Sequence, residues 1–145
     1  MTVKDVMSKR LVAVSPEDTV YGAAELMQRH DIGTILVCDA KGLKGVLTDR
    51  DIVTRCVSTG KNSNTTAVSD VMTESPVYVR PDQSVLEAAK LMATEQIRRL
   101  PVVDDQQVVG ILSLGDMART KIFDMEVAVA ISDISESKED HRQKR

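Results

Sequence analysis

The sequence predicts an α/β fold built from two pseudo-symmetric repeats. Residues 5–53 align with residues 70–118 without a gap, so one pattern of strands and helices occurs twice. In each copy, runs rich in β-branched residues alternate with runs whose apolar residues have helical spacing. Each copy is too small to bury its apolar surface well by itself. We therefore expect two repeats of order β-α-β-β-α, packed on each other through their sheets.

The first helix of each repeat is expected within residues 18–33 and 83–97. In the first repeat the apolar positions with helical spacing are Val20, Ala23, Ala24, Met27 and Ile32. Thr19 or Asp18 is the expected N-cap, and Gly33 the expected stop. In the second repeat, Ser84 followed by Glu87 forms the signature of a capping box, which predicts the start of that helix.

A strand pair and a second helix follow in each repeat. The strands are expected at 34–39 and 43–48, and at 99–104 and 108–113, because these runs are rich in β-branched residues and are separated by short polar turns. The second helix is expected to begin at Thr48 or Ser113 and to run through 49–58 or 115–131.

The expected organisation is a first repeat at 1–60, a linker at 61–68 and a second repeat at 69–125. The linker belongs to a polar run of Ser, Thr, Asn and Gly. Residues 126–145 are expected to hold the end of the last helix and a highly charged tail.

Composition excludes several classes of function. The net charge is −3 with interspersed signs and there is no Trp, which argues against nucleic acid and against an anionic membrane. The two cysteines and two histidines lack metal-ligand spacing, so no metal is expected. No signal core or apolar span is present, and we expect a reduced, cytoplasmic chain. No catalytic constellation can be proposed, so we expect that the protein is not an enzyme.

Each repeat ends its strand pair with the pattern glycine, apolar residue, any residue, hydroxyl residue, two further residues, aspartate. The copies are Gly45, Val46, Thr48 and Asp51 in the first repeat, and Gly110, Ile111, Ser113 and Asp116 in the second. The hydroxyl and the carboxylate are three residues apart and therefore neighbours on the first helical turn. Such a pair can accept hydrogen bonds from a ribose diol, while the glycine allows a close backbone approach. The alternative is that the hydroxyl residues are N-caps and the aspartates are favourable first-turn charges.

The gapless tandem repeat, the opening "DVM" of each copy, "IRRLPVVDD" and the glycine pattern together resemble the cystathionine β-synthase (CBS) domain pair, or Bateman module. The resemblance covers residues 1 to about 120. It implies that the hydroxyl residue and the aspartate of each copy hold the ribose of an adenine nucleotide, in clefts between the repeats.

The resemblance further implies that Arg98 and Arg99, at the start of a strand, contact the nucleotide phosphates. Arg50 is another candidate, because a guanidinium binds phosphate in a bidentate manner. The alternative is that these arginines are solvated surface charges, for which Asp104 and Asp105 are candidate partners.

Candidates for the adenine pocket are Val12, Val77 and Tyr78. The two sites are not equal. Gly33 and Thr34 replace the arginine pair in the first repeat, and Leu114 and Gly115 replace the Asp-Arg pair in the second.

These features predict a regulatory sensor that binds AMP, ADP or ATP, with S-adenosylmethionine and NAD left open as ligands. No cofactor is required, and the output passes through an unidentified effector protein. Apolar residues on more than one side of 121–131 further predict a homodimer. The alternative is a ligand-free module that serves only dimerisation or docking to a partner.

Overall fold

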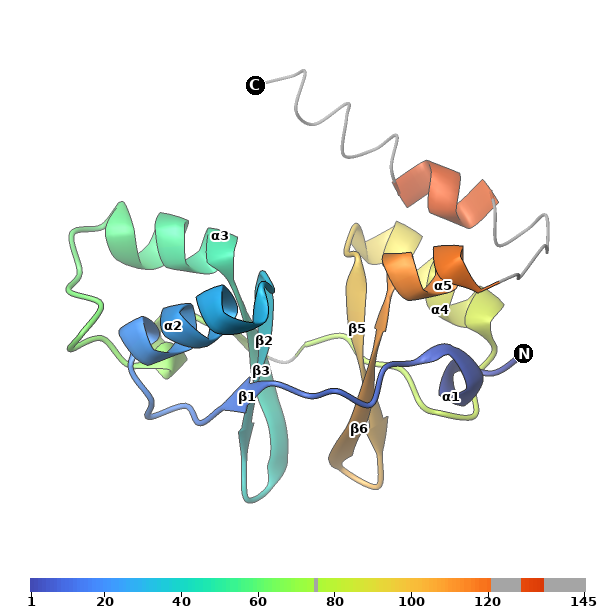
Figure 1. Cartoon of the computed structure of the whole chain (residues 1–145), viewed down its shortest axis with the longest axis horizontal. Coiled ribbons are helices and arrows are strands. Elements are labelled where there is room, and N and C mark those ends of the chain that lie inside the picture. Colours follow the sequence, from blue (N-terminus) through green and yellow to red (C-terminus); the bar gives the residue numbers. More distant parts are fainter. Residues whose placement is uncertain (75, 121–128, 135–145) are drawn as a thin grey trace. The chain divides into compact units, whose positions relative to one another are not determined.

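The structure is a computed structural model and describes residues 1–74, 76–120 and 129–134 (Figure 1). Its elements, in chain order, are α1 (Val3–Val6), β1 (Ala13–Val14), α2 (Val20–His30), β2 (Thr34–Asp39), β3 (Gly42–Thr48), α3 (Asp49–Ile52), the π-helix η1 (Val53–Val57), the 3-10 helix η2 (Val68–Asp70), β4 (Thr73–Glu74), α4 (Val85–Glu95), β5 (Arg99–Asp104), β6 (Gln107–Ser113) and α5 (Leu114–Arg119). The predicted α/β class is confirmed, and the order helix, strand, strand, helix occurs in both repeats, whereas the short strand expected before the first helix forms, as β1, only in the first repeat.

The chain divides into two compact units, which we name after their motif aspartates. The Asp51 unit is Leu11–Pro76, and the Asp116 unit combines Met1–Arg10 with the described part of Val77–Arg145. The opening segment of each repeat therefore packs with the other repeat's strands. In the Asp116 unit, the Val3 N–H donates to the Gln83 carbonyl at 2.9 Å, and in the Asp51 unit the Val68 N–H donates to the Asp18 carbonyl at 2.8 Å.

The sheet of the Asp51 unit has the strand order β1-β2-β3-β4, with β1 parallel to β2 and the other pairs antiparallel. In the Asp116 unit, β5 and β6 pair in the same way as β2 and β3. The place that corresponds to β1 has only an isolated bridge, between Val79 and Val102. Proline explains the difference. The Leu36 N–H donates to the Val12 carbonyl, whereas Pro101, 65 positions later, has no N–H to donate.

The helix starts follow the expected caps. Thr19 caps α2 by accepting a hydrogen bond from the Gly22 N–H at 3.1 Å, and Ser84 caps α4 by accepting one from the Glu87 N–H at 3.0 Å. The expected stop at Gly33 is wrong, because α2 ends at His30 and its C-cap is Asp31, two residues before Gly33. Asp31 takes a left-handed conformation with φ 52° and closes the helix, since aspartate tolerates this region better than most residues.

The second helices differ from the expectation in length and shape. After α3 the chain continues as the π-helix η1 up to Val57. α5 stops at Arg119, where Thr120 turns to an extended conformation, so the expected continuous helix over 115–131 is wrong. Residues 121–128, which carry most of the segment used to predict a homodimer, lie outside the described residues. Residues 129–134 are helical, and Ala130 and Ile134 are buried in the Asp116 unit's core.

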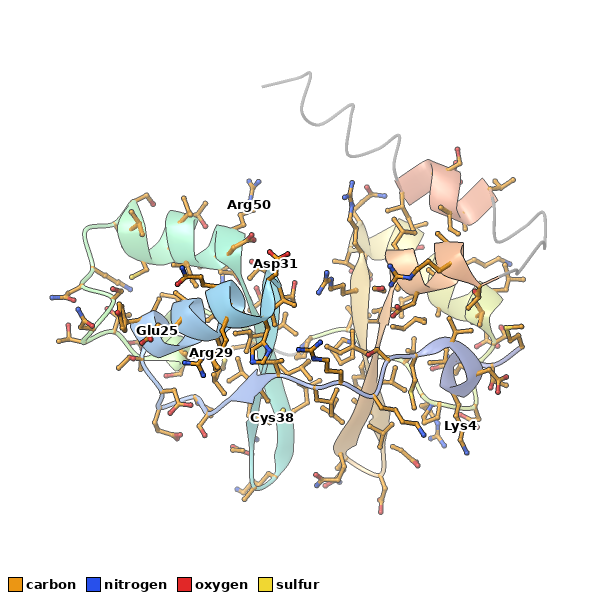
Figure 2. The ribbon with its side chains drawn as sticks, in the orientation of Figure 1. Lys4, Glu25, Arg29, Asp31, Cys38 and Arg50 are labelled. Carbon is orange, nitrogen blue, oxygen red and sulfur yellow. The ribbon has the colours of Figure 1, made fainter. Side chains whose placement is uncertain are left out.

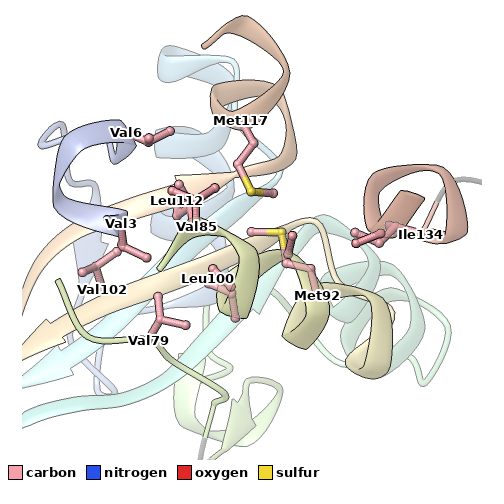
Figure 3. Close-up of a cluster of buried hydrophobic side chains, with 13 residues drawn as sticks. Val3, Val6, Val79, Val85, Met92, Leu100, Val102, Leu112, Met117 and Ile134 are labelled. Carbon is pink, nitrogen blue, oxygen red and sulfur yellow. The ribbon is translucent and has the colours of Figure 1, made fainter. Parts of the chain in front are cut away.

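Each unit has its own apolar core. In the Asp116 unit, Met92 of α4 and Met117 of α5 pack with Leu100 and Leu112 of the strand pair (Figure 3). In the Asp51 unit, Ile35, Val37 and Leu47 from the sheet pack with Met27 of α2 and Cys56 of η1, and Cys38 and Cys56 are free thiols. None of the helices in residues 1–74, 76–120 and 129–134 has the length and apolar character needed to cross a membrane.

Candidate functional site

Thr48 and Asp51 form a reciprocal capping box at the start of α3. The Asp51 N–H donates to Thr48 Oγ1 at 3.0 Å, and the Thr48 N–H donates to Asp51 Oδ2 at 3.0 Å. The local sequence dictates this arrangement, because a hydroxyl at the N-cap and a carboxylate three residues later can satisfy each other's backbone N–H groups. The capping alternative is therefore realised in the structure, and it uses only one of the two carboxylate oxygens.

Asp51 has two further partners that come from outside this turn. The Thr73 hydroxyl of β4 donates to Asp51 Oδ2 at 3.5 Å. Arg55 Nη1 lies 4.0 Å from Asp51 Oδ1 and also donates to the carbonyls of Val71 at 3.2 Å and Met72 at 3.0 Å. Asp51 is only 8% exposed. The Asp51 carboxylate therefore belongs to a network of polar contacts that connects α3 and η1 to the segment Val71–Thr73.

Ser113 and Asp116 repeat the capping box at the start of α5. The Asp116 N–H donates to Ser113 Oγ at 2.9 Å, and the Ser113 N–H donates to Asp116 Oδ2 at 3.1 Å. Asp116 Oδ1 accepts a hydrogen bond at 3.0 Å from Arg119, one turn along the helix. The two motif copies thus have the same backbone geometry but different side-chain surroundings.

The motif glycines permit a close approach by another part of the chain. A Cβ at Gly45 would lie 2.5 Å from the Thr73 carbonyl oxygen and 2.9 Å from Met72 Sδ. A Cβ at Gly110 would lie 2.5 Å from Met7 Sδ and 3.0 Å from the Ser8 carbonyl oxygen. In both units the approaching segment is the "DVM" opening of the other repeat. The close backbone approach expected at Gly45 therefore serves chain packing.

Of the motif's apolar residues, Val46 pairs with Thr73, and Ile111 exchanges backbone hydrogen bonds with Ser8. Among the adenine-pocket candidates, Val12 and Val77 are half-buried and pack against the cores of their units. Tyr78 is 53% exposed. Val12 lies in the Asp51 unit, whereas Val77 and Tyr78 lie in the Asp116 unit.

The candidate phosphate-binding arginines are exposed. Arg50 lies on the first turn of α3, and its side chain points away from the helix (Figure 2). Arg99 is opposite Ser113 in the β5–β6 register, and the Arg98 carbonyl accepts a hydrogen bond from the Leu114 N–H at 2.8 Å. The structure therefore places the backbone of Arg98 and Arg99 at the end of the strand pair where Ser113 lies.

The alternative pairing of these arginines with Asp104 or Asp105 does not occur among the described residues. Arg99 and Asp104 are the two ends of β5, roughly 17 Å apart at the usual rise of a strand. Ser113, at the near end of the strand pair, is the closer neighbour of both arginines.

Sequence reasoning missed three residues of these sites: Arg55, Thr73 and Arg119. A signal was present for the two arginines, because Arg55 follows Asp51 by four residues and Arg119 follows Asp116 by three, and both spacings place an ion pair on one helix face. Thr73 is 22 residues from Asp51, and no local spacing could reveal that contact.

Comparison with known proteins gives the family. The sequence model of the CBS domain matches residues 3–58 and again residues 68–121. The CBS domain-containing protein YhcV of Bacillus subtilis is 42% identical over 134 residues, which cover 92% of this chain and 95% of that protein.

Solved structures similar to this chain belong to the same family. The conserved CBS domain protein TA0289 of Thermoplasma acidophilum has a TM-score of 0.82 at 28% identity, covering 96% of this chain and 76% of that chain. The CBS domain pair of protein MJ0100, solved in complex with 5′-methylthioadenosine and S-adenosyl-L-methionine, has a TM-score of 0.72 at 28% identity, covering 82% and 94%. Because the family match covers both repeats, this chain belongs to the CBS domain family and carries a tandem pair of these domains.

Proposed function

We propose that this CBS pair is a regulatory sensor that binds an adenosine-containing ligand and passes the signal to a partner chain, without enzymatic activity of its own. The observation that carries the proposal is the hydroxyl–aspartate pair, found with the same geometry in both units. A carboxylate can accept hydrogen bonds from both hydroxyls of a ribose, and charge-assisted bonds of this kind are the strong ones.

The ligand class is supported by the relative that holds 5′-methylthioadenosine and S-adenosyl-L-methionine, because both compounds contain adenosine. In this chain, Arg98 and Arg99 are exposed beside the second motif. Guanidinium groups bind phosphate well, whereas the sulfonium of S-adenosylmethionine is itself a cation. The arginine pair therefore favours AMP, ADP or ATP over S-adenosylmethionine.

Titration calorimetry with AMP, ATP, adenosine, S-adenosylmethionine and NAD tests this proposal. We expect ATP and AMP to bind, and the double variant Arg98→Ala/Arg99→Ala to weaken their binding by roughly ten- to a hundredfold. Adenosine lacks phosphate and should bind both proteins within about twofold of each other. If none of these compounds binds the wild-type protein, the sensor proposal is wrong.

A ligand-free interaction module is the second candidate. It is favoured by the capping boxes, which give each motif aspartate a structural use without any ligand. The ligand-free module predicts that Arg98→Ala/Arg99→Ala does not change the affinity for any small molecule. It also predicts that any defect of variants at the two motif aspartates follows from their loss of stability alone.

We also propose that the protein is a homodimer. Support comes from Val53 and Val57, two apolar side chains four residues apart on η1 that are 57% and 63% exposed. Exposed apolar residues on one helix are typical of an association surface, and two-fold pairing is the commonest way for identical chains to associate.

A further inference from the structure

A short helical segment near the end of the described chain packs on a side of α4 that the corresponding helix α2 exposes to solvent. Residues 129–134 are helical, and they contribute Ala130 and Ile134 to the core of the Asp116 unit. We propose that this side of α4 is a docking site for an amphipathic helix of a partner chain, and that residues 129–134, the docked segment, occupy it until such a helix replaces them. This inference rests on the part of the proposed function in which a partner chain receives the signal.

The docked segment is amphipathic. Ala130 is 7% exposed, Ile134 is fully buried, and Ile131 packs against the same core while partly buried. These positions, i, i+1 and i+4, lie on one side of a helix. Val129 and Asp133 are exposed on the other side. The docked segment therefore presents an apolar side to the core of the Asp116 unit.

The receiving surface is a row of apolar residues on α4, which we name the α4 stripe: Leu86, Ala89 and Ala93. They are spaced three and four residues apart and so lie on one face of the helix. Ala89 is fully buried, and Leu86 and Ala93 pack, partly buried, against the cluster that also contains Ala130 and Ile134. Figure 3 shows the Ile134 side chain directed toward α4. The docked segment and the α4 stripe therefore share one apolar cluster.

The corresponding side of α2 is open to solvent. The residues 65 positions before the α4 stripe are Tyr21, Ala24 and Gln28. Tyr21 is 48% exposed, Gln28 is exposed and Ala24 is half-buried. Ala23 and Met27, on the inward side of α2, are nevertheless buried. The inward side of its first helix is thus sufficient to close the core of a repeat, and the α4 stripe with its docked segment is an addition to that core.

The docked segment indicates the chemistry of the partner. Helices that bind in apolar grooves do so through anchor residues three and four positions apart. Here the anchors are a small residue, Ala130, and a branched apolar residue four positions later, Ile134. On the receiving side, Ala89 and Ala93 are small, and small side chains allow two helices to approach closely. The partner that fits is therefore an amphipathic helix with a small and a branched apolar residue at i and i+4.

Peptide binding without nucleotide tests the inference. The probe is a fluorescein-labelled peptide with the sequence of residues 126–138, titrated into the full chain and followed by fluorescence anisotropy. Ile134→Asp in the protein places a charge at the buried anchor, which is costly, so the docked segment should leave the α4 stripe. We expect the peptide to bind Ile134→Asp at least about tenfold more tightly than wild type, because the tethered segment of the wild type competes at a high effective concentration.

Two controls accompany this titration. Val129→Asp changes an exposed position of the same segment, so this variant should bind the peptide as weakly as wild type. A peptide that itself carries Ile134→Asp should not bind. Ile134→Ala, a milder change, should increase binding in the same direction as Ile134→Asp but by a smaller factor.

Three results would overturn the inference. The first is a peptide that binds neither Ile134→Asp nor Ile134→Ala more tightly than wild type. The second is unfolding of both variants in circular dichroism, because the docked segment would then be an integral part of the core. The third is a rise in mass of Ile134→Asp in light scattering, because a second copy of the chain would then occupy the α4 stripe. Since no nucleotide is present, these results decide the docking site whether or not the protein binds AMP.

Discussion

Gly45→Ala is the substitution for which the structure gives the sharpest prediction of stability. The new Cβ would lie 2.5 Å from the Thr73 carbonyl oxygen, an atom of the backbone of β4, and 2.9 Å from Met72 Sδ. Ordinary contacts of a Cβ begin near 3.4 Å, so β4 would have to move by about 1 Å. Because β4 is paired to β3 at Gly45 and Val46, such a movement disturbs the sheet.

Two opposing effects determine how much Gly45→Ala changes the free energy of unfolding. Overpacking costs about 1–3 kcal/mol, and an immobile backbone atom as the obstacle places this case near the upper end. Replacing glycine by alanine returns about 0.5–1 kcal/mol by restricting the unfolded chain. We therefore expect a net loss of about 2 kcal/mol. With an unfolding entropy of about 2.1 cal/mol/K per residue and 145 residues, Tm should fall by about 7 °C.

Gly110→Ala and Gly33→Ala are the matched controls. At Gly110 the nearest atom is Met7 Sδ, at 2.5 Å, and a flexible thioether can move aside, so we expect a loss of about 1 kcal/mol. At Gly33 the nearest atom is Asp49 Oδ2, at 3.0 Å on an exposed side chain, and Tm should stay within about 1 °C of wild type. Thermal unfolding followed by circular dichroism measures all three. The reasoning is refuted if Gly110→Ala is as damaging as Gly45→Ala, or if Gly45→Ala leaves Tm unchanged.

Three further predictions concern association, thiol reactivity and acid stability. Light scattering at micromolar concentration should show a wild-type dimer and a monomeric Val53→Asp/Val57→Asp variant; a monomeric wild type would contradict the homodimer. Burial raises the pKa of the Cys38 thiol, so at pH 8 it should react with Ellman's reagent more slowly than an unfolded control, and equal rates would be evidence against this burial. Hydrogen bonds from Thr2 lower the pKa of Asp5 below 3.8 in the folded state, so its stabilising effect is present above the unfolded pKa and disappears as the pH falls through the folded value. Asp5→Asn should therefore lower Tm at pH 7, and this difference from wild type should shrink as the pH falls through the folded pKa; a difference that does not change with pH would contradict this.

The sequence by itself determined the features that depend on neighbouring residues. The gapless repeat predicted two similar sets of strands and helices, and the caps at Thr19 and Ser84 were correctly identified. The capping boxes of Thr48 with Asp51 and of Ser113 with Asp116 were visible as an alternative to ribose binding. All these interactions join residues no more than three positions apart, so the pattern of residue types is sufficient to predict them.

Two details of the backbone were not predicted: the residue that ends α2, and the loss of a strand at Val79. Gly33 was expected to stop α2, but Asp31 takes the left-handed conformation instead, because that region is open to a few residue types besides glycine. The sequence shows that Pro101 has no N–H. That this leaves a bridge at Val79 in place of a full strand could be seen only once the strand register was known.

The tertiary structure alone decided how the two motif copies differ. Arg55 reaches carbonyls 16 and 17 residues away, and Thr73 reaches Asp51 over 22 residues. These contacts exist because the opening segment of the second repeat packs against the strands of the first, with Gly45 leaving room for its backbone. The sequence repeat indicates that two such segments exist. Which strands each segment joins is decided by the packing of residues far apart in the chain, since contacts at that separation leave no periodic trace in the sequence.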